Sequence, residues 1–310
     1  MEGPQPEPQT ITPFVFFVEY LINMTTNAAV VSLWCSKLAF AFIALSLGAG
    51  FIFLFRRTEA LFKSGLCLLG CALTLQAAAF AAFTISFWAV PEHRFYLPLH
   101  TFKGMILFLS LAVNAILFGL EFKRGTGVTF VFVLPWSLLA LLGPAFAPTT
   151  PFALLDPKFK SVLFLLHPPL LLASYALLIN AFGASSSLLL SNWELRTHKP
   201  HQLTYSLPSI DEMDRLIWLL VSAAVPLLIT GMFLGGVQLH YARLENARGL
   251  DIKELVGLAT IMVYGSSLVL RKYGDWRGTK AAWANVAGFI LIITAILVAD
   301  KLSAYHKFFF

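Results

Sequence analysis

The residues with the most chemistry to offer in this chain are its seven histidines. His100 precedes a long apolar run, His167 lies inside one, and His240 and His306 each follow one. Imidazole is a common axial ligand of haem iron, and a planar porphyrin can lie between helix ends. Two histidines from different helices at matching depth would meet that need. The candidate ligands are therefore His100, His167, His240 and His306.

The elements that must position these side chains are membrane helices. Of the 310 residues, 58% are hydrophobic and only 12% are charged, whereas about a quarter are charged in soluble domains. About 20 apolar residues span a bilayer, and backbone polar groups within hydrocarbon must be satisfied inside the segment. The chain is therefore predicted to be an all-α, polytopic transmembrane helical bundle.

Eight spans are predicted within a single domain over residues 30–310. They are Val30–Phe55, Leu61–Val90, Thr101–Phe122, Val128–Phe146, Ser161–Ser191, Leu216–Leu239, Leu255–Leu270 and Ala282–Leu302. The segment 1–29 begins Pro-rich. Its apolar part, Ile11–Met24, carries Glu19 and Asn23 and is short for a span, so an interfacial helix is the alternative there.

Both chain ends are predicted to lie outside the membrane. This orientation divides the 22 basic residues into twelve inside and ten outside. The stronger asymmetry is local, because three basic pairs each end a span on the inner side: Arg56-Arg57, Lys123-Arg124 and Arg271-Lys272. His198 and His201 then fall inside, and the other five histidines fall outside.

His167 is the strongest single candidate for chemistry. It precedes Pro168 and Pro169 within an apolar run, where an ionisable side chain is costly and marks a functional site. The prolines remove backbone donors, which could open a cavity beside the imidazole. His100 and His240 could instead donate to lipid headgroups or helix-end carbonyls. Histidines in polar loops are expected to be solvated: His93, His198 and His201.

Several classes of function find no support in the sequence. No C-x-x-C-H stands in the chain, so no site for covalently attached haem is present. The net charge of +6 fits loops against anionic lipid, and no basic stripe with interleaved aromatics indicates nucleic-acid binding. Carboxylates predicted outside are scattered without a nucleophile–base spacing, and no catalytic residue is identified.

The segment Phe164–Leu178 reads FLLHPPLLLASYALL, so a histidine is followed seven residues later by Ser-Tyr-Ala. This pattern resembles the CcsA/ResC and HemX-like cytochrome c assembly family, the haem-handling, WWD-type membrane proteins. Other stretches similar to the family follow in the same order: Pro98–Thr101, Leu207–Arg215, Ala224–Gly236, Trp276–Ala281 and His306. The resemblance covers about Tyr96 to His306, roughly two thirds of the chain.

The resemblance implies non-covalent haem b, held on the outer side of a bacterial inner membrane with His167 and His306 as the axial pair. Its partners would be membrane lipid, another integral membrane subunit and a c-type cytochrome. The family's Trp-rich loop corresponds to His240–Glu254, which keeps Asp251, Lys253 and Glu254 but has no tryptophan. Ile252 replaces a proline and Val269 an intramembrane histidine. The alternative axial pair is His100 with His240. Arg243 and Arg248 could bind the haem carboxylates.

Three functions compete. The first is a haem-delivery component of a cytochrome c synthase-type system. The second is an electron-transfer subunit that keeps its haem b, which the missing tryptophans and intramembrane histidine favour, with a quinone site near Tyr175 as further support. The third is a haem-free scaffold that binds a partner through the small-residue face Gly183–Ser187. A transporter is a weaker fourth reading, because no internal repeat is found.

Overall fold

The computed structural model describes residues 13–56, 58–90, 93–94, 96–127, 129–147, 162–197, 209–243 and 252–297. Side chains are described from Asn27 onward, apart from a few near helix ends. Eight α-helices and one short 3₁₀ helix position the site: α1 (Pro13–Arg56), α2 (Glu59–Trp88), η2 (Pro98–His100), α3 (Phe102–Arg124), α4 (Thr129–Phe146), α5 (Val162–Arg196), α6 (Ile210–Arg243), α7 (Ile252–Tyr273) and α8 (Thr279–Leu297).

Each of the eight α-helices is long and apolar enough to cross a membrane. The described part of the chain contains no strand, so the prediction of an integral, all-α membrane protein is confirmed. The eight predicted spans match the eight helices, most of which extend a few residues further at one end or both. Apart from α1, the largest extension is in α6, which begins at Ile210 rather than Leu216.

The first helix is longer than its predicted span. α1 contains 44 residues and runs without a break from Pro13 into the span that begins near Asn27. At 1.5 Å per residue it is about 66 Å long, roughly twice the hydrocarbon thickness. Ile11–Met24 is thus helical from Pro13 onward and continuous with the span. Its placement along the membrane interface stays a prediction.

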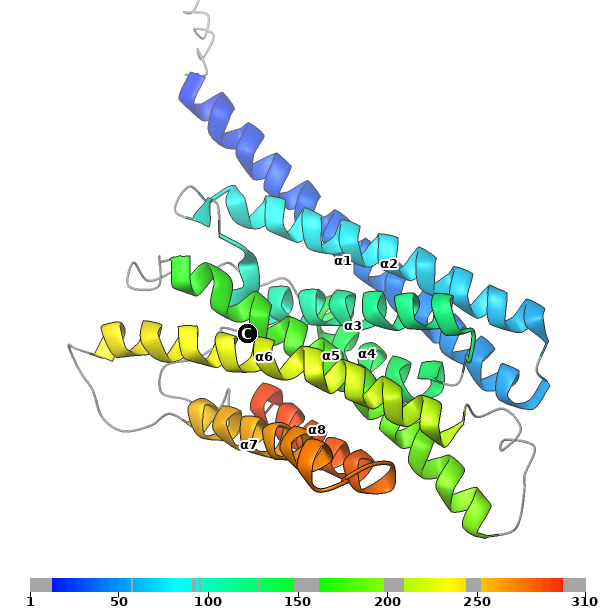
Figure 1. Ribbon diagram of the computed structural model, residues 1–310. Helices are drawn as coiled ribbons and strands as arrows, with labels where there is room; N and C mark the ends of the chain where they lie inside the picture. The colour runs from blue at the N-terminus through cyan, green and yellow to red at the C-terminus, as the bar shows by residue number, and fades with distance from the viewer. Residues whose placement is uncertain are drawn as a thin grey trace, which may run out of the picture.

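The helices pack as two peripheral hairpins around a central group (Figure 1). α1 packs along α2 and α4 on one side, and α7 packs with α8 on the other. α5 is the central helix, because it contacts α3, α4, α6 and α8. α5 and α6 lie antiparallel along much of their length, and this pair carries the candidate site.

A polar network ties three helices together inside the bundle. Gln76 of α2 donates to Ser110 of α3 (2.7 Å), and Asn114 of α3 donates to Gln76 (3.0 Å) and to Ser137 of α4 (2.7 Å). All four side chains are buried. Buried polar groups are costly unless they are hydrogen-bonded, so this network favours one arrangement of α2, α3 and α4.

The predicted partner-binding face Gly183–Ser187 has a different role. Gly183, Ala184, Ser185 and Ser187 are buried, and a Cβ at Gly183 would collide with Val133 of α4. The small residues thus allow α5 to approach α4 within the chain. They are not available to a second protein, and that prediction was wrong.

Candidate functional site

The chain reverses at every turn, so helix ends gather into two groups. We call one the histidine end: it contains the C-terminal ends of α2 and α6, η2, and the first turns of α3 and α5. His93, His100, His167 and His240 belong to it. The opposite end, which contains Glu121 and Asp214, we call the carboxylate end. The predicted gathering of these histidines at one end follows from the helix directions in Figure 1.

His167 lies in the second turn of α5 and faces α6. Its Nδ1 is 2.6 Å from the carbonyl oxygen of Gly231. A carbonyl oxygen can only accept a hydrogen bond, so Nδ1 carries the proton. In the neutral ring Nε2 then holds the lone pair, and any metal would bind His167 through Nε2. Histidine ligands of metals are commonly fixed in this way by a second hydrogen bond to a carbonyl.

Two glycines of α6 make room for this imidazole. A Cβ at Gly235 would collide with the His167 ring, and a Cβ at Gly231 would lie 2.8 Å from Leu171. The ring therefore lies directly against the α6 backbone. The Gly-x-x-x-Gly spacing puts both glycines on one face of the helix, as in membrane helix pairs that approach closely.

Ser174 repeats the contact two turns further along α5. Its hydroxyl donates to the Ala224 carbonyl at 3.0 Å. The two donors are seven residues apart on α5, and the two acceptors are seven residues apart on α6 in the reverse direction. This explains the His-to-Ser spacing in the sequence, because both side chains fix the same antiparallel register.

His100 and His93 form a second group around Phe87. His93 is fully buried and stacks on the Phe87 ring with centroids 4.2 Å apart, so the prediction of a solvated His93 was wrong. His100 lies 5.1 Å from Phe87 and 6.1 Å from His93, centroid to centroid. The Trp88 indole donates to the Tyr96 carbonyl at 2.7 Å, which holds this turn against α2.

Burial, with a smaller effect of the neighbouring His93, lowers the pKa of His100 to about 4. The ring is therefore neutral at physiological pH, which is the form that can ligate a metal. η2, which carries His100, contacts α2, α3 and α5. His100 thus packs at the same end of the bundle as His167.

Lys103 is a further polar residue of the histidine end that the sequence reasoning passed over. Its ammonium nitrogen is shielded from solvent and has no hydrogen-bond partner among the described residues. It lies 5.3 Å from the centre of the Phe83 ring. The only available sequence signal was a lysine placed three residues after His100 at the start of an apolar run.

The remaining predicted site residues are His240, Arg243, Arg248 and His306. His240 is exposed near the end of α6. The backbone of Arg243 ends the same helix, but its side chain is not described. Arg248 and His306 lie outside the described residues. Neither histidine pairing is therefore tested, and both stay predictions. Across the described part of the chain, no three His, Cys, Asp or Glu side chains form a metal-binding group.

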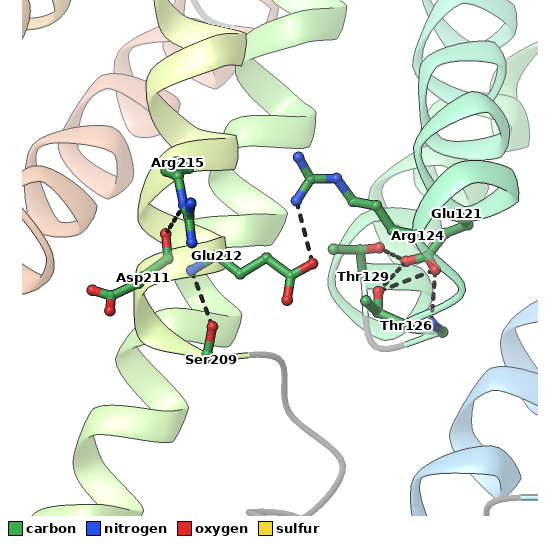
Figure 2. Close-up of polar contacts among 9 residues, drawn as sticks. Glu121, Arg124, Thr126, Thr129, Ser209, Asp211, Glu212 and Arg215 are labelled. Atoms are coloured by element: carbon green, nitrogen blue, oxygen red, sulfur yellow. Dashed lines mark hydrogen bonds and ion pairs between the residues drawn. The ribbon is translucent and has the colours of Figure 1, made fainter.

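At the carboxylate end, hydrogen bonds and an ion pair hold the helix ends and turns together (Figure 2). Buried Glu121 accepts hydrogen bonds from the hydroxyls of Thr126 and Thr129 and from the Gly127 amide, the last at 2.7 Å. Arg124, at the end of α3, lies 3.7 Å from Glu212 of α6. Neither carboxylate faces the histidine end, so these contacts stabilise turns and helix ends.

A second buried carboxylate joins α6 to the last hairpin. Asp214 accepts two hydrogen bonds from the Arg271 guanidinium, at 2.7 and 2.6 Å, and one from the Gly278 amide at 2.8 Å. The guanidinium also lies 5.1 Å from the Trp218 ring centre. This bidentate pair fixes α7 and the α7–α8 turn against α6.

Comparison with known proteins decides the family. The sequence profile described as "Cytochrome C assembly protein" matches residues 26–304, almost the whole chain. The chain belongs to the cytochrome c assembly protein family. This membership supports a role in cytochrome c biogenesis and confirms the resemblance found around His167.

Two known proteins are similar to this chain at low sequence identity. Protein HemX of Bacillus subtilis (strain 168) is 24% identical over 247 residues, which cover 79% of this chain and 87% of that protein. The uncharacterized 28.8 kDa protein in the nifR3-like 5'region of Azospirillum brasilense is 30% identical over 130 residues. That match covers 42% of this chain and 48% of the Azospirillum protein.

The donor set at the histidine end fits a haem. His167 has the tautomer that leaves Nε2 for iron, His100 is neutral, and both belong to the same end. Buried aromatic rings such as Phe87 surround the second group. Val269, at the position of the family's intramembrane histidine, is 57% exposed on α7. That position therefore supplies no ligand toward the core.

Proposed function

We propose that this protein holds haem b at the histidine end and delivers it to an apocytochrome c. In this proposal the histidine end faces the outside of a bacterial cytoplasmic membrane, and His167 is an axial ligand. Another integral membrane subunit would complete the assembly machinery. Bound haem would supply the iron porphyrin that a c-type cytochrome requires.

The observation that carries the proposal is the hydrogen bond from His167 Nδ1 to the Gly231 carbonyl. It fixes the ring orientation and tautomer before any ligand binds, and this preorganisation lowers the cost of binding. Gly235 keeps the ring against α6. The protein's own role is thus to hold a neutral imidazole with Nε2 as its ligating atom.

The test is a reduced-minus-oxidised visible spectrum of the full chain, purified in detergent with haem supplied. His167→Asn keeps an amide N–H near the Nδ1 position, so the α5–α6 contact is retained while the iron ligand is lost. We expect this variant to lose the signal of a six-coordinate b-type haem. Ser174→Ala, which removes the equivalent hydrogen bond without touching a ligand, should keep it.

Two results would contradict the proposal. Haem that binds His167→Asn with an unchanged spectrum would make His167 a helix-packing residue only, like Ser174. A folded wild-type protein that takes up no haem would exclude haem handling altogether. Transfer of bound haem to an apocytochrome c then distinguishes delivery from permanent retention.

Retention in an electron-transfer subunit is the second candidate. Val269 stands where many haem-exporting members of the family carry a histidine, and its side chain points out of the described bundle. A route for haem across the bilayer through this chain is thus not supported. A haem that is stoichiometric, redox-active and not transferred would favour this candidate.

A further inference from the structure

We propose that Lys103 binds a carboxylate of the haem, so that the group around η2 is the anionic recognition part of the site. This inference rests on the proposed function, because it names how the same ligand is recognised at its polar edge. Three features support it: an enclosed ammonium without an acceptor among the described residues, the charges of the described residues at this end, and the place of η2 in the fold.

The ammonium group of Lys103 lies in an enclosed, aromatic environment. The Nζ of Lys103 is enclosed, it contacts the face of Phe83, and no described residue accepts a hydrogen bond from it. Moving an ammonium group out of water without a counter-ion costs on the order of several kcal/mol. Lysine near a membrane surface ordinarily extends toward water instead. An enclosed ammonium without an acceptor among the described residues therefore points to an anion that binds there.

The second step is the sign of the surrounding charge. Lys103 lies in the first turn of α3, where the helix dipole is positive and a cation is unfavourable. A carboxylate bound here would interact favourably with the ammonium and with the helix start together.

The third step is the distribution of carboxylates in the described structure. Eight aspartate and glutamate side chains are described, and seven lie at the carboxylate end: Glu59, Glu121, Glu194, Asp211, Glu212, Asp214 and Asp275. The eighth, Glu254, stands in the first turn of α7 and so belongs to the histidine end. No hydrogen bond joins Lys103 to any of these eight carboxylates.

The last step is proximity to the iron ligand. η2 contacts α3 and also α5, the helix that carries His167. One amphipathic ligand at this end could thus be held by an imidazole at its metal and by an ammonium at its acidic edge. Haem has that combination, with a metal at the centre and two carboxylates at one edge.

The experiment measures affinity by absorbance titration of the full chain in nanodiscs of zwitterionic lipid. The probes are haem b and its dimethyl ester, which lacks the negative charges. A charge-assisted hydrogen bond contributes enough for Lys103→Met to weaken haem binding by roughly ten-fold or more. Lys103→Arg, which keeps the charge, should restore most of the affinity. The ester should bind wild type and Lys103→Met alike.

Matched controls separate the outcomes. Lys63→Met removes an exposed lysine at the other end of α2, which pairs with Glu59 at 2.7 Å, and should not change haem affinity. Equal haem affinity in wild type and Lys103→Met would overturn the inference and leave the proposed function intact. No uptake of haem or ester by wild type would overturn both.

A lipid phosphate is the competing source of negative charge. Adding phosphatidylglycerol to the nanodiscs should leave the difference in haem affinity between wild type and Lys103→Met unchanged. If that difference appears only with phosphatidylglycerol present, Lys103 recognises a lipid headgroup and the assignment to haem is wrong.

Discussion

The two ends of the bundle treat charge in opposite ways. At the carboxylate end, buried Glu121 and Asp214 each accept at least three hydrogen bonds, from hydroxyls, amides or a guanidinium. At the histidine end, the enclosed ammonium of Lys103 has no hydrogen-bond acceptor among the described residues, and His100 is kept neutral by burial. Self-satisfied charges stabilise a fold, whereas unsatisfied ones indicate a place for a ligand.

The contrast also separates helix anchoring from chemistry. Bidentate Asp214–Arg271 and the Glu121 turn each join neighbouring elements that must stay in place. The histidine end has the neutral His100 ring, the other imidazoles and the aromatic rings instead. We infer that stability is concentrated at one end and recognition at the other, and three measurements can break or sharpen this division.

The largest effect is expected for Asp214→Asn. The substitution leaves Arg271, whose side chain is 14% exposed, without its charged partner, and breaking such a buried pair costs about 3–4 kcal/mol. Chemical unfolding in detergent, followed by circular dichroism, measures the loss. Asp275→Asn is the control, since the Asp275 side chain is 85% exposed in its pair with Arg277. A comparable loss in both variants would contradict the anchoring role.

A smaller effect is expected for the pH dependence of stability at the histidine end. The pKa of His100 is about 4 in the folded protein, against 6.5 for the free side chain. Above pH 6.5 the ring is neutral in both the folded and the unfolded protein, so its titration does not affect stability. As the pH falls from 6.5 toward 4, the unfolded protein binds a proton that the folded protein does not, and the free energy of unfolding decreases. The loss at pH 4.5 should reach about 2 kcal/mol.

Comparison of wild type with His100→Gln isolates this contribution. The free energy of unfolding should fall less between pH 7.5 and pH 4.5 in the variant, by about the same 2 kcal/mol. Parallel pH profiles would mean that His100 is accessible to water and not buried as the structure has it. Titrating groups that do not interact with His100 are common to both proteins and cancel in the difference.

The smallest effect is expected for Glu121→Gln at the carboxylate end. The amide oxygen of Gln keeps part of the hydrogen bonding to Thr126 and Gly127, but the negative charge that both donors face is lost. We expect the free energy of unfolding to fall by about 1–2 kcal/mol, without change in haem binding. Glu59→Gln, with a side chain 79% exposed, should show no loss. A loss of haem binding in Glu121→Gln would contradict the division between the ends.

Most of the fold could be predicted from hydropathy alone. Eight apolar runs gave eight helices because hydrocarbon leaves the backbone few alternatives. The partners of each helix could not be predicted in this way. The small-residue face Gly183–Ser187 shows why, since close packing against α4 and packing against a second protein demand the same residue types.

Of the site residues, only those whose position inside an apolar run places them within the membrane could be predicted from the sequence. His167 could be identified because an imidazole inside an apolar run is costly wherever the run packs. His93 was misassigned because its polar neighbours suggested a solvated loop, whereas the aromatic ring of Phe87 holds it inside. Lys103 could not be recognised, because its lack of a partner is a property of three-dimensional surroundings and not of spacing.

The matched spacing along α5 and α6 has a consequence for how such chains can change. His167 and Ser174 meet Gly231 and Ala224 at equal intervals read in opposite directions. Inserting one residue between the two donors would turn one of them about 100° around the helix axis and break a contact. The seven-residue interval inside each helix must therefore stay constant for both contacts to form together.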